Sequence, residues 1–322
     1  MSARGPAPEL APTGAGRRGP VQVGDRVFAA AAVAAGVLIL VVLAGVGVFL
    51  LAEGFPAITA SADEIPGEGG IWHFIWTLLY GTVYVAVLAL VIATPLSIGI
   101  ALFISHFAPR RIAAGLGYII DLLAAVPSVI FGLWGFNFVA QHVKTAYPWL
   151  RDNLGFLPFF QDTVNATGTS LLTVGIVLAV MIMPIMTAVN REVFLQTPRL
   201  QEEAALALGA TRYEMVRMTV LPFSRSGIIS GAMLGLGRAM GETIAVAMVL
   251  SPVPGYVSLN LIGQQNPGTV ASNIALKFPE YSGIQVNALI ASGLALFVLT
   301  FLVNFGARAI VARRAAFSGA DA

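Results

Sequence analysis

The chain has 322 residues, of which 57% are hydrophobic and only 11% are charged, and its formal net charge is +2. A soluble domain typically carries about 25% charged residues, so this composition favours a protein embedded in a membrane. The small net charge argues against a nucleic-acid-binding protein. The chain contains no cysteine, which excludes disulfide and thiolate chemistry, and its three histidines are too scattered for a metal-binding motif.

The two ends of the chain predict cytoplasmic tails around a central membrane domain. Residues 1–26 are rich in Pro, Gly and Ala, which is typical of a disordered tail. The apolar run 27–52 behind them is much longer than the roughly 7–15 residues of a signal peptide core, and it exceeds the roughly 20 residues that cross a bilayer. We therefore predict a membrane domain over residues 27–312, preceded by tail 1–26 and followed by tail 313–322.

Six apolar stretches predict six transmembrane helices, because a lone span must satisfy its own backbone hydrogen bonds. They lie at 27–51, within 74–105, within 116–139, within 170–193, at 227–250 and at 286–311. Pro95, Pro127 and Pro184 fall inside spans, where each removes a backbone hydrogen bond and can kink the helix. Such breaks either line a cavity, as they do in transporters, or serve packing alone.

The positions of the basic residues predict the orientation of these spans. With both termini in the cytoplasm, fourteen arginines fall on the inner side and three basic residues on the outer side, while Arg238 stays within the membrane. The positive-inside rule favours this arrangement. The inner residues are Arg4, Arg17, Arg18, Arg26, Arg110, Arg111, Arg191, Arg199, Arg212, Arg217, Arg225, Arg308, Arg313 and Arg314, and the outer ones are Lys144, Arg151 and Lys277.

The charged stretch 198–222 between the fourth and fifth spans predicts two short cytoplasmic helices. Thr197-Pro198 is typical of a helix start, with Thr197 as the N-cap. Gly209 is placed to end the first helix, and Thr211 and Glu214 have the spacing of a capping box that opens the second. We expect Leu221-Pro222 to end that second helix. Considered alone, the pattern also fits an amphipathic helix pair lying on the membrane surface, with Leu200, Ala204, Ala207 and Leu208 on one face.

The fifth predicted span carries two charges near its middle, Arg238 and Glu242. Charge at this depth is costly, so such residues face protein or water. Gly227, Gly231 and Gly235 recur every four residues and predict a ridge for close helix packing on the same stripe. At i, i+4 spacing the two charges can pair with each other.

Two interpretations of this pair remain open. The pair neutralises itself so that the helix can insert, or Arg238 is a transient ligand for an anion that crosses the membrane, because its planar fork of donors suits phosphate oxygens. Glu242 could also accept the hydrogen bond of a protonated phosphate and so repel sulfate.

Three motifs together resemble a known transporter family. Glu203-Ala204-Ala205, Gly209 and Leu221-Pro222 have the spacing of the EAA loop of ABC-importer permeases, with Thr219 where that family usually has isoleucine. The third span contains DLLAAVPSVIFG from Asp121 to Gly132, and the fifth contains LGRAMGET from Leu236 to Thr243. Across about residues 27–312 the chain resembles the C-type permease subunit of the phosphate-specific ABC importer.

This resemblance implies an all-α integral membrane protein with the six-helix type I ABC importer permease fold. It implies that Glu203, Ala204, Ala205, Gly209, Leu221 and Pro222 couple the chain to a separate ATPase. It also implies that Arg238 and Glu242 act in phosphate movement, and we expect Ser128 and Thr243 beside them on the path. For Ser128 the alternative is a kink that serves packing only.

The implied partners are a second related permease, two ATP-binding subunits, an extracytoplasmic phosphate-binding protein and membrane lipid, in a bacterial plasma membrane. ATP and magnesium would belong to the partner ATPase, because this sequence has no G-x-x-x-x-G-K-[ST] loop and we expect no cofactor in it. Three alternatives stay open: an importer for sulfate or molybdate, a stand-alone secondary anion transporter, and a membrane enzyme. The sequence contains no nucleophile motif and no pair of inward carboxylates, which argues against the membrane enzyme.

Overall fold

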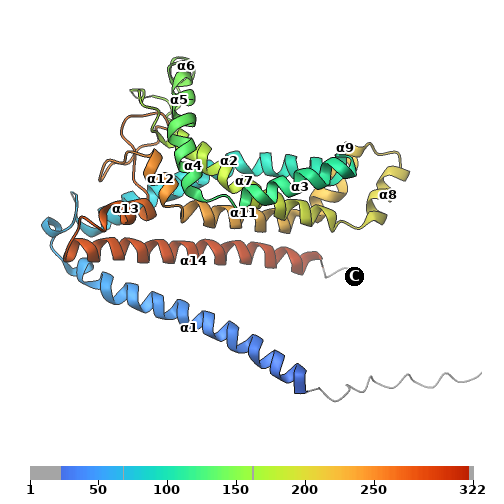
Figure 1. Cartoon of the computed structure of the whole chain (residues 1–322), viewed down its shortest axis with the longest axis horizontal. Helices are drawn as coiled ribbons and strands as arrows, with labels where there is room; N and C mark the ends of the chain where they lie inside the picture. The colour runs from blue at the N-terminus through green and yellow to red at the C-terminus, as the bar shows by residue number, and fades with distance from the viewer. Residues whose placement is uncertain (1–22, 68, 162, 319–322) are drawn as a thin grey trace, which may run out of the picture. The chain divides into compact units, whose positions relative to one another are not determined.

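The computed structural model describes residues 23–67, 69–161 and 163–318, and these residues divide into two units at Phe49 and Leu50. The described part of the first unit is helix only, the beginning of α1 (Val23–Thr59). The predicted tail 1–26 lies almost wholly outside the described residues, although α1 already begins at Val23. The second unit, Leu50–Ala322, contains every other element (Figure 1).

The second unit is all-helical within its described residues, with two isolated bridges, Val164 to Gly263 and Pro252 to Asn266, in place of a sheet. Its long helices are α2 (Gly70–Leu102), α3 (Arg110–Ala124), α7 (Leu171–Leu195), α11 (Arg225–Met240) and α14 (Ile284–Ser318). The short ones are α4 (Ser128–Trp134), α5 (Ala140–Val143), α6 (Tyr147–Leu154), α8 (Arg199–Ala207), α9 (Arg212–Met215), α10 (Leu221–Phe223), α12 (Ile244–Val249) and α13 (Val270–Lys277). Single π-helical turns follow α2, α4 and α9, at Phe103–Phe107, Gly135–Val139 and Val216–Val220, and 3-10 turns stand at Ala62–Glu64 and Lys144–Ala146.

Within the described residues, four helices are long and apolar enough to cross a membrane, so the chain is a multi-pass membrane protein. They cover Gly24–Thr59, Gly70–Phe107, Leu171–Leu195 and Ile284–Ala309. A fifth span is counted if Arg110–Ala124 and Ser128–Leu154 are taken together, although they meet at an angle of 92°. α14 continues to Ser318, six residues beyond the end predicted for the membrane domain.

The prediction of six continuous spans is therefore corrected at two places. The third predicted span, within 116–139, is broken at Ala125–Pro127, where Pro127 has no N–H to continue the helical ladder. The fifth, 227–250, is broken at Gly241–Thr243, so that α11 has only 16 residues. Glycine has low helix propensity, and the hydroxyl of Thr243 turns back to donate to the Gly241 carbonyl at 3.2 Å, which competes with helix continuation.

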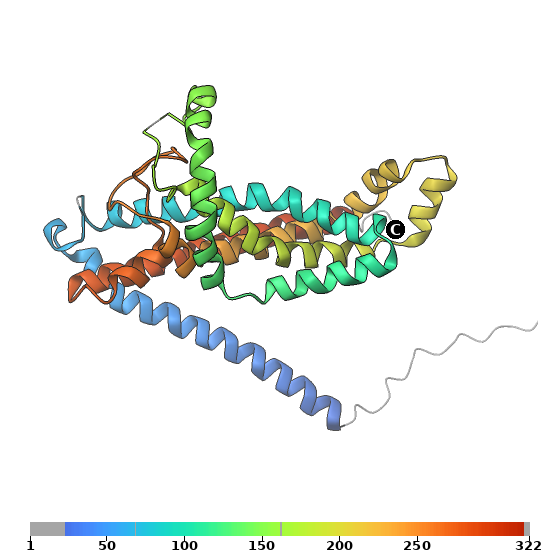
Figure 2. The ribbon, with the colours of Figure 1, turned by 45° about the horizontal axis from the view of Figure 1, so that its top comes forward.

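Helix α7 forms the centre of the second unit, because α2, α3 and α11 all pack against it. Its inward side chains include Val177, Met181 and Ile182, which belong to the main hydrophobic core. Both Figure 1 and Figure 2 show α2, α7 and α11 running side by side, with α4, α5 and α6 standing crosswise to them. The long helices thus supply the core, and the broken ones surround it.

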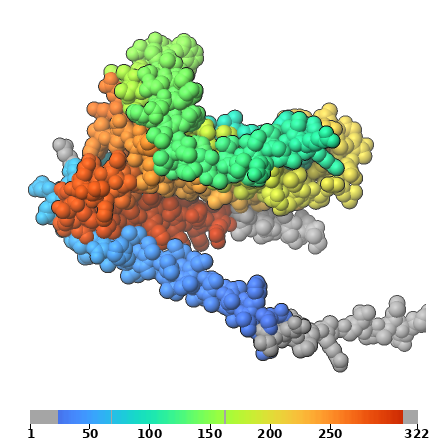
Figure 3. Space-filling view, in the orientation of Figure 1, coloured from blue at the N-terminus to red at the C-terminus, as the bar shows by residue number. Residues whose placement is uncertain are grey.

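The two ends of this helical layer are built differently. At one end lies the loop of α8 and α9, coloured yellow in Figure 3, and the C-terminal end of α14 points the same way in Figures 1 and 2. At the other end the segments after α6 and after α12 are held together by backbone hydrogen bonds, such as Asn165 N to Ile262 O at 2.9 Å and Leu261 N to Phe159 O at 2.9 Å.

Candidate functional site

The predicted path residues Arg238, Glu242 and Thr243 stand at the break between α11 and α12. Arg238 is in the last turn of α11, Gly241 follows its end, and Thr243 is the N-cap of α12. Because the helix stops at Met240, the chain at this point has backbone groups that are not tied up in a regular ladder. Broken helices of this kind line binding sites in many transporters.

The pairing that the i, i+4 spacing allows between Arg238 and Glu242 is not made in the structure. The ion pairs in the described part of the chain do not include either residue. The Glu242 side chain, only 8% exposed, accepts instead a hydrogen bond through Oε1 from Ala245 N at 3.0 Å and so caps α12. The i, i+4 rule assumes an unbroken helix, and the break between Met240 and Ile244 removes that geometry.

Arg238 is half-buried and has a hydrogen-bonding deficit. Its Nε atom is buried and has no hydrogen-bond partner among the described residues. A buried donor that lacks a partner is costly, and such a donor often marks the place of a water or an ion. An arginine in this condition is able to take an anion.

The predicted glycine ridge on α11 is confirmed, and its partner is α7. A Cβ atom on Gly227 would lie 2.4 Å from Val193 Cγ1, and one on Gly235 would lie 2.7 Å from Met186 Sδ. Side chains larger than hydrogen would therefore push the two helices apart. This close contact holds α11, and with it Arg238, against the central helix.

The second broken helix lies next to the first. Gly132 of α4 packs so closely on α12 that a Cβ atom there would be 2.9 Å from Ala245 Cα. Ser128, the first residue of α4, is half-buried, whereas Asp121 on α3 is exposed. The structure therefore brings the helix of Ser128 beside the helix that follows Thr243, whereas Asp121 lies on α3 before the break. Pro95 and Pro184, in contrast, lie inside helices that continue through them.

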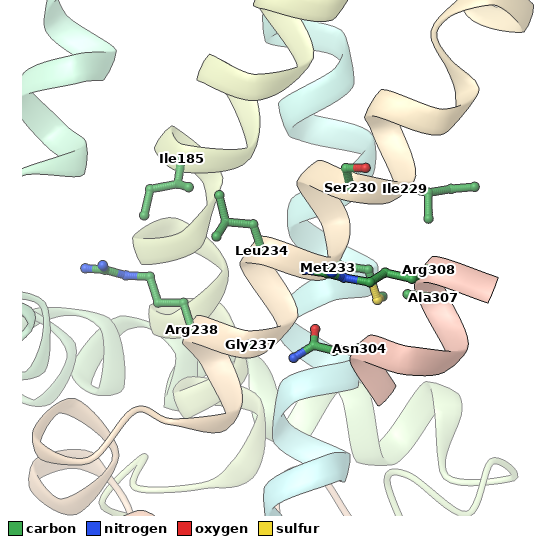
Figure 4. A pocket seen from close by; sticks show the side chains of 10 residues that line it. All are labelled: Ile185, Ile229, Ser230, Met233, Leu234, Gly237, Arg238, Asn304, Ala307 and Arg308. Carbon is green, nitrogen blue, oxygen red and sulfur yellow. The ribbon is translucent and has the colours of Figure 1, made fainter. Parts of the chain in front are cut away.

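A cavity of about 650 Å³ lies beside Arg238, between α7, α11 and α14 (Figure 4). Its polar side chains are Arg238, Ser230, Asn304 and Arg308. The remainder of the lining is apolar, with Gly237: Ile185, Ile229, Met233, Leu234 and Ala307. No carboxylate contributes to the lining, so the cavity carries a positive charge. The described residues hold no group of three or more His, Asp and Glu side chains that could bind a metal ion.

The predicted helix–turn–helix of the 198–222 loop is confirmed in its main features. Gly209 follows α8 with φ +88°, and hydrogen bonds from Gly209 N to Leu206 O and from Ala210 N to Ala205 O close the end of the helix. Thr211 and Glu214 form the predicted capping box: Thr211 N donates to Glu214 Oε2 at 2.8 Å, and Glu214 N donates to Thr211 Oγ1 at 3.3 Å. The Glu214 carboxylate accepts hydrogen bonds from both Thr211 N and Thr211 Oγ1, and these two bonds hold the pKa of the exposed Glu214 carboxyl below its ordinary value.

Two details of this loop differ from expectation. Pro198, not Thr197, occupies the N-cap of α8, and the Thr197 hydroxyl is buried and makes no hydrogen bond with any described residue. Leu221-Pro222 does not end the second helix at once, because the chain continues from α9 through the π-helical turn Val216–Val220 into α10 and stays helical to Phe223.

The loop has an outward face and an inward face. Glu203, Ala204, Gly209 and Pro222 are exposed, and Leu200 and Leu208 are 77% and 90% exposed. Ala205 and Leu221 instead pack against a small core that contains Phe194 and Met215. An apolar outward face on a water-exposed loop is typical of a docking surface.

Sequence reasoning missed one contact that anchors this loop. His106, in the π-helical turn after α2, lies with Nε2 3.4 Å from Glu202 Oε1 on α8, and its Nδ1 lies 2.7 Å from Ser105 Oγ. The two residues are 96 positions apart in the chain, and no spacing rule connects a lone histidine with a distant glutamate. The contact ties α8 to the end of α2.

Comparison with known proteins gives a consistent family. Residues 93–316 match the family model of the "Binding-protein-dependent transport system inner membrane component". A Mycobacterium tuberculosis protein named "Phosphate transport system permease protein PstC 2" is 45% identical over 304 residues, covering 90% of this chain and 93% of that protein. A Xylella fastidiosa protein named "Phosphate transport system permease protein PstC" is 43% identical, over 74% of this chain and 73% of that protein. A Mesorhizobium japonicum protein of the same name is 35% identical, over 92% of this chain and 92% of that protein.

Among solved structures, a chain of the inward-facing MetNI methionine ABC transporter aligns with a TM-score of 0.47 and 18% identity, covering 75% of this chain and 96% of that one. That likeness is too distant to carry an argument. The sequence matches do carry one, because the family model covers more than half of the chain and the relatives are similar over most of both lengths. The chain therefore belongs to the family of binding-protein-dependent transport system inner membrane components, the permeases of ABC transporters, together with the PstC proteins.

Proposed function

We propose that this permease carries inorganic phosphate into the cell as one membrane subunit of an ATP-driven importer. As a permease component, the chain is not itself an enzyme. The relatives named for phosphate transport support the choice of substrate. The observation that carries the proposal within the chain is Arg238, a half-buried arginine with an unpartnered Nε at a broken helix.

Arg238 supplies the recognition of the anion in this proposal. Its guanidinium offers donors in a planar fork that matches phosphate oxygens, and the apolar side chains around the cavity strengthen the attraction. Because Glu242 is engaged with α12, it does not neutralise Arg238. One Glu242 oxygen, Oε2, makes no hydrogen bond to a described residue and can accept a hydrogen bond from the O–H group of hydrogen phosphate, which sulfate lacks at neutral pH. Thr243 and Ser128 complete the path at the two helix breaks.

Coupling to ATP occurs through the 198–222 loop in this proposal. Glu203, Ala204, Gly209 and Pro222, which are exposed, dock on the ATPase, while Ala205 and Leu221 hold the loop on the membrane domain. The full importer contains a second related permease, two ATP-binding subunits that bind ATP and magnesium, and an extracytoplasmic phosphate-binding protein. The chain itself needs no cofactor. It lies in a bacterial plasma membrane with both termini in the cytoplasm, in line with the shared direction of the α8–α9 loop and the end of α14.

Uptake of labelled phosphate and labelled sulfate in the same cells tests the role of Arg238. Loss of a charge-assisted contact of about 1.5–3 kcal/mol predicts that Arg238→Ala lowers phosphate uptake by about ten- to a hundredfold. Arg238→Lys keeps the charge without the fork and is expected to lie in between. Phosphate uptake that survives Arg238→Ala unchanged contradicts the proposal, and wild-type uptake of sulfate in place of phosphate supports the alternative importer for another oxyanion.

A stand-alone anion transporter remains the second alternative. Purification of the chain with its bound partners distinguishes this alternative from the proposal. The proposal predicts that an ATPase co-purifies with the chain and is lost when Glu203 or Gly209 is altered. Phosphate uptake by the purified chain without any ATPase would support the stand-alone transporter.

A further inference from the structure

The cavity between α7, α11 and α14 contains a second arginine that the proposed path does not use. Arg308 comes from α14 and lines the same cavity as Arg238 (Figure 4). It makes no hydrogen bond or ion pair with a described residue, and the same is true of Asn304 one turn earlier on α14. Ser230, the other polar lining residue, already donates its hydroxyl hydrogen to the Ser226 carbonyl at 2.9 Å.

These side chains lie at successive levels along α11 and α14. In Figure 4, Arg238 extends from one side of α11, Asn304 lies beside Gly237, and Arg308 reaches from α14 toward Met233. Met233 is one helical turn before Gly237, which corresponds to about 6 Å along the axis. Because α11 begins directly after the 198–222 loop, and Arg308 reaches the level of Met233 while Arg238 follows Gly237, Arg308 lies nearer to that loop than Arg238 does (Figure 4).

The positive charge of the cavity favours an anionic ligand. Two arginines, the half-buried Arg238 and the exposed Arg308, contribute to one lining without a carboxylate, beside apolar residues such as Ile185 and Met233. No side chain fills the space at Gly237, where a Cβ atom would have no neighbour within 4 Å. The volume of about 650 Å³ lies within the usual range of ligand pockets, about 300–1,000 Å³.

We propose that Arg308 and Asn304 form a second binding position for a phosphate group, about one helical turn from Arg238 toward the 198–222 loop. Arg308 provides paired N–H donors and the Asn304 amide provides a further donor. Two sources of the phosphate group share this chemistry: the transported anion after it leaves Arg238, and the headgroup of an anionic lipid whose acyl chain lies along the apolar walls. The first source rests on the proposed function.

Reconstituted complexes that contain the chain and its partners test this second position. We compare Arg308→Gln and Arg308→Lys with Arg225→Gln, a matched control in which an exposed arginine at the start of α11, outside the cavity, is changed. Each complex is placed in phosphatidylcholine alone and in phosphatidylcholine with one third phosphatidylglycerol. The measurements are labelled-phosphate uptake, equilibrium binding of labelled phosphate, and the amount of phosphatidylglycerol that stays bound.

Arg308→Gln is expected to lower uptake by about fivefold or more, Arg225→Gln by less than about twofold, and Arg308→Lys is expected to restore part of the loss. If the position takes the transported anion, the loss is the same in both lipid mixtures and less labelled phosphate is bound. If it takes a lipid headgroup, the loss appears only with phosphatidylglycerol, and less of that lipid is retained. Arg308→Gln that matches Arg225→Gln in all three measurements overturns the proposal.

These outcomes are separate from those of the proposed function. A wild-type complex without phosphate uptake refutes phosphate import, while the retained lipid still tests the second position. A wild-type complex that imports phosphate, with an Arg308→Gln variant that behaves like its control, refutes only the second position.

Discussion

At the scale of single residues, Gly209 is the position where the coupling loop depends most directly on backbone conformation. Its φ of +88° lies in the left-handed region, where an L side chain costs roughly 1–2 kcal/mol. We predict that Gly209→Ala speeds hydrogen exchange of the amides around the turn by about five- to thirtyfold. Exchange measured by mass spectrometry on the loop peptides gives the result directly.

Gly99 is the matched control for this substitution. It lies inside α2, and a Cβ atom there has no neighbour within 4 Å. Gly99→Ala should therefore leave exchange unchanged or slow it slightly, because alanine favours a helix more than glycine does. Equal exchange in both variants would show that the turn at Gly209 does not need its left-handed conformation.

Residues whose role depends on local geometry were predictable from the sequence, and residues whose role depends on a distant partner were not. Gly209 and the Thr211–Glu214 pair were found because turn and cap chemistry acts over a few residues. The partner of Glu242 was missed because it depends on where α11 stops. The contact of His106 with Glu202 joins elements 96 positions apart, beyond the reach of any local pattern.

At the scale of elements, the capping box of α9 makes a pH-dependent prediction. Hydrogen bonds from Thr211 lower the pKa of Glu214, so its charged form is favoured by the folded loop. The stabilisation is complete above the unfolded-state pKa and is lost as the pH falls through the folded-state pKa. We predict that exchange at the start of α9 becomes faster as the pH is lowered from 7 to below 4, after correction for the intrinsic rate.

Helix α13 provides the internal control. Its N-cap, Thr269, accepts from Ser272 N at 3.4 Å and uses no carboxylate. The corrected exchange rate at the start of α13 should stay constant over the same pH range. A parallel change at both helix starts would mean that the whole protein loosens in acid and that Glu214 has no local effect.

Some helices can be identified from amino-acid composition alone, whereas the positions of the helix breaks depend on tertiary packing. α1, α2, α7 and α14 were recognisable as long apolar helices because length and composition are enough to identify a span. The breaks after α3 and α11 come from Pro127 and Gly241 together with the close contact of Gly132 on Ala245. Proline and glycine mark where a membrane helix can break, but tertiary contacts decide whether it does, as the continuous helices through Pro95 and Pro184 demonstrate.

At the scale of the whole molecule, the two ends of the helical layer in the second unit have different surfaces. The α8–α9 loop presents exposed leucines at one end, and backbone hydrogen bonds close the segments after α6 and α12 at the other. Arg238 and the cavity lie on α11, which connects the loop with the broken region. A movement imposed on the loop can reach the arginine along α11 because the glycine ridge holds this helix closely against α7.

Leu208 gives the sharpest test of that separation. It is 90% exposed in the chain alone, so replacing it with glutamine should not disturb the fold. If the outward face of α8 docks on the ATPase, Leu208 becomes buried in the complex, where a leucine contributes about 1.5–3 kcal/mol. We therefore predict that Leu208→Gln weakens retention of the ATPase by about tenfold or more.

The control is Phe156→Gln at the opposite end of the layer, where an aromatic residue is 75% exposed. Both variants remove an exposed apolar side chain, but only Leu208 lies on the loop proposed to dock. Titration of the purified membrane subunits with the ATPase measures both dissociation constants under one condition. Both variants replace an exposed apolar side chain with glutamine. An equal loss of affinity in the two variants would therefore show that the loss does not depend on the position of the residue, and it would contradict docking of the ATPase on the outward face of α8.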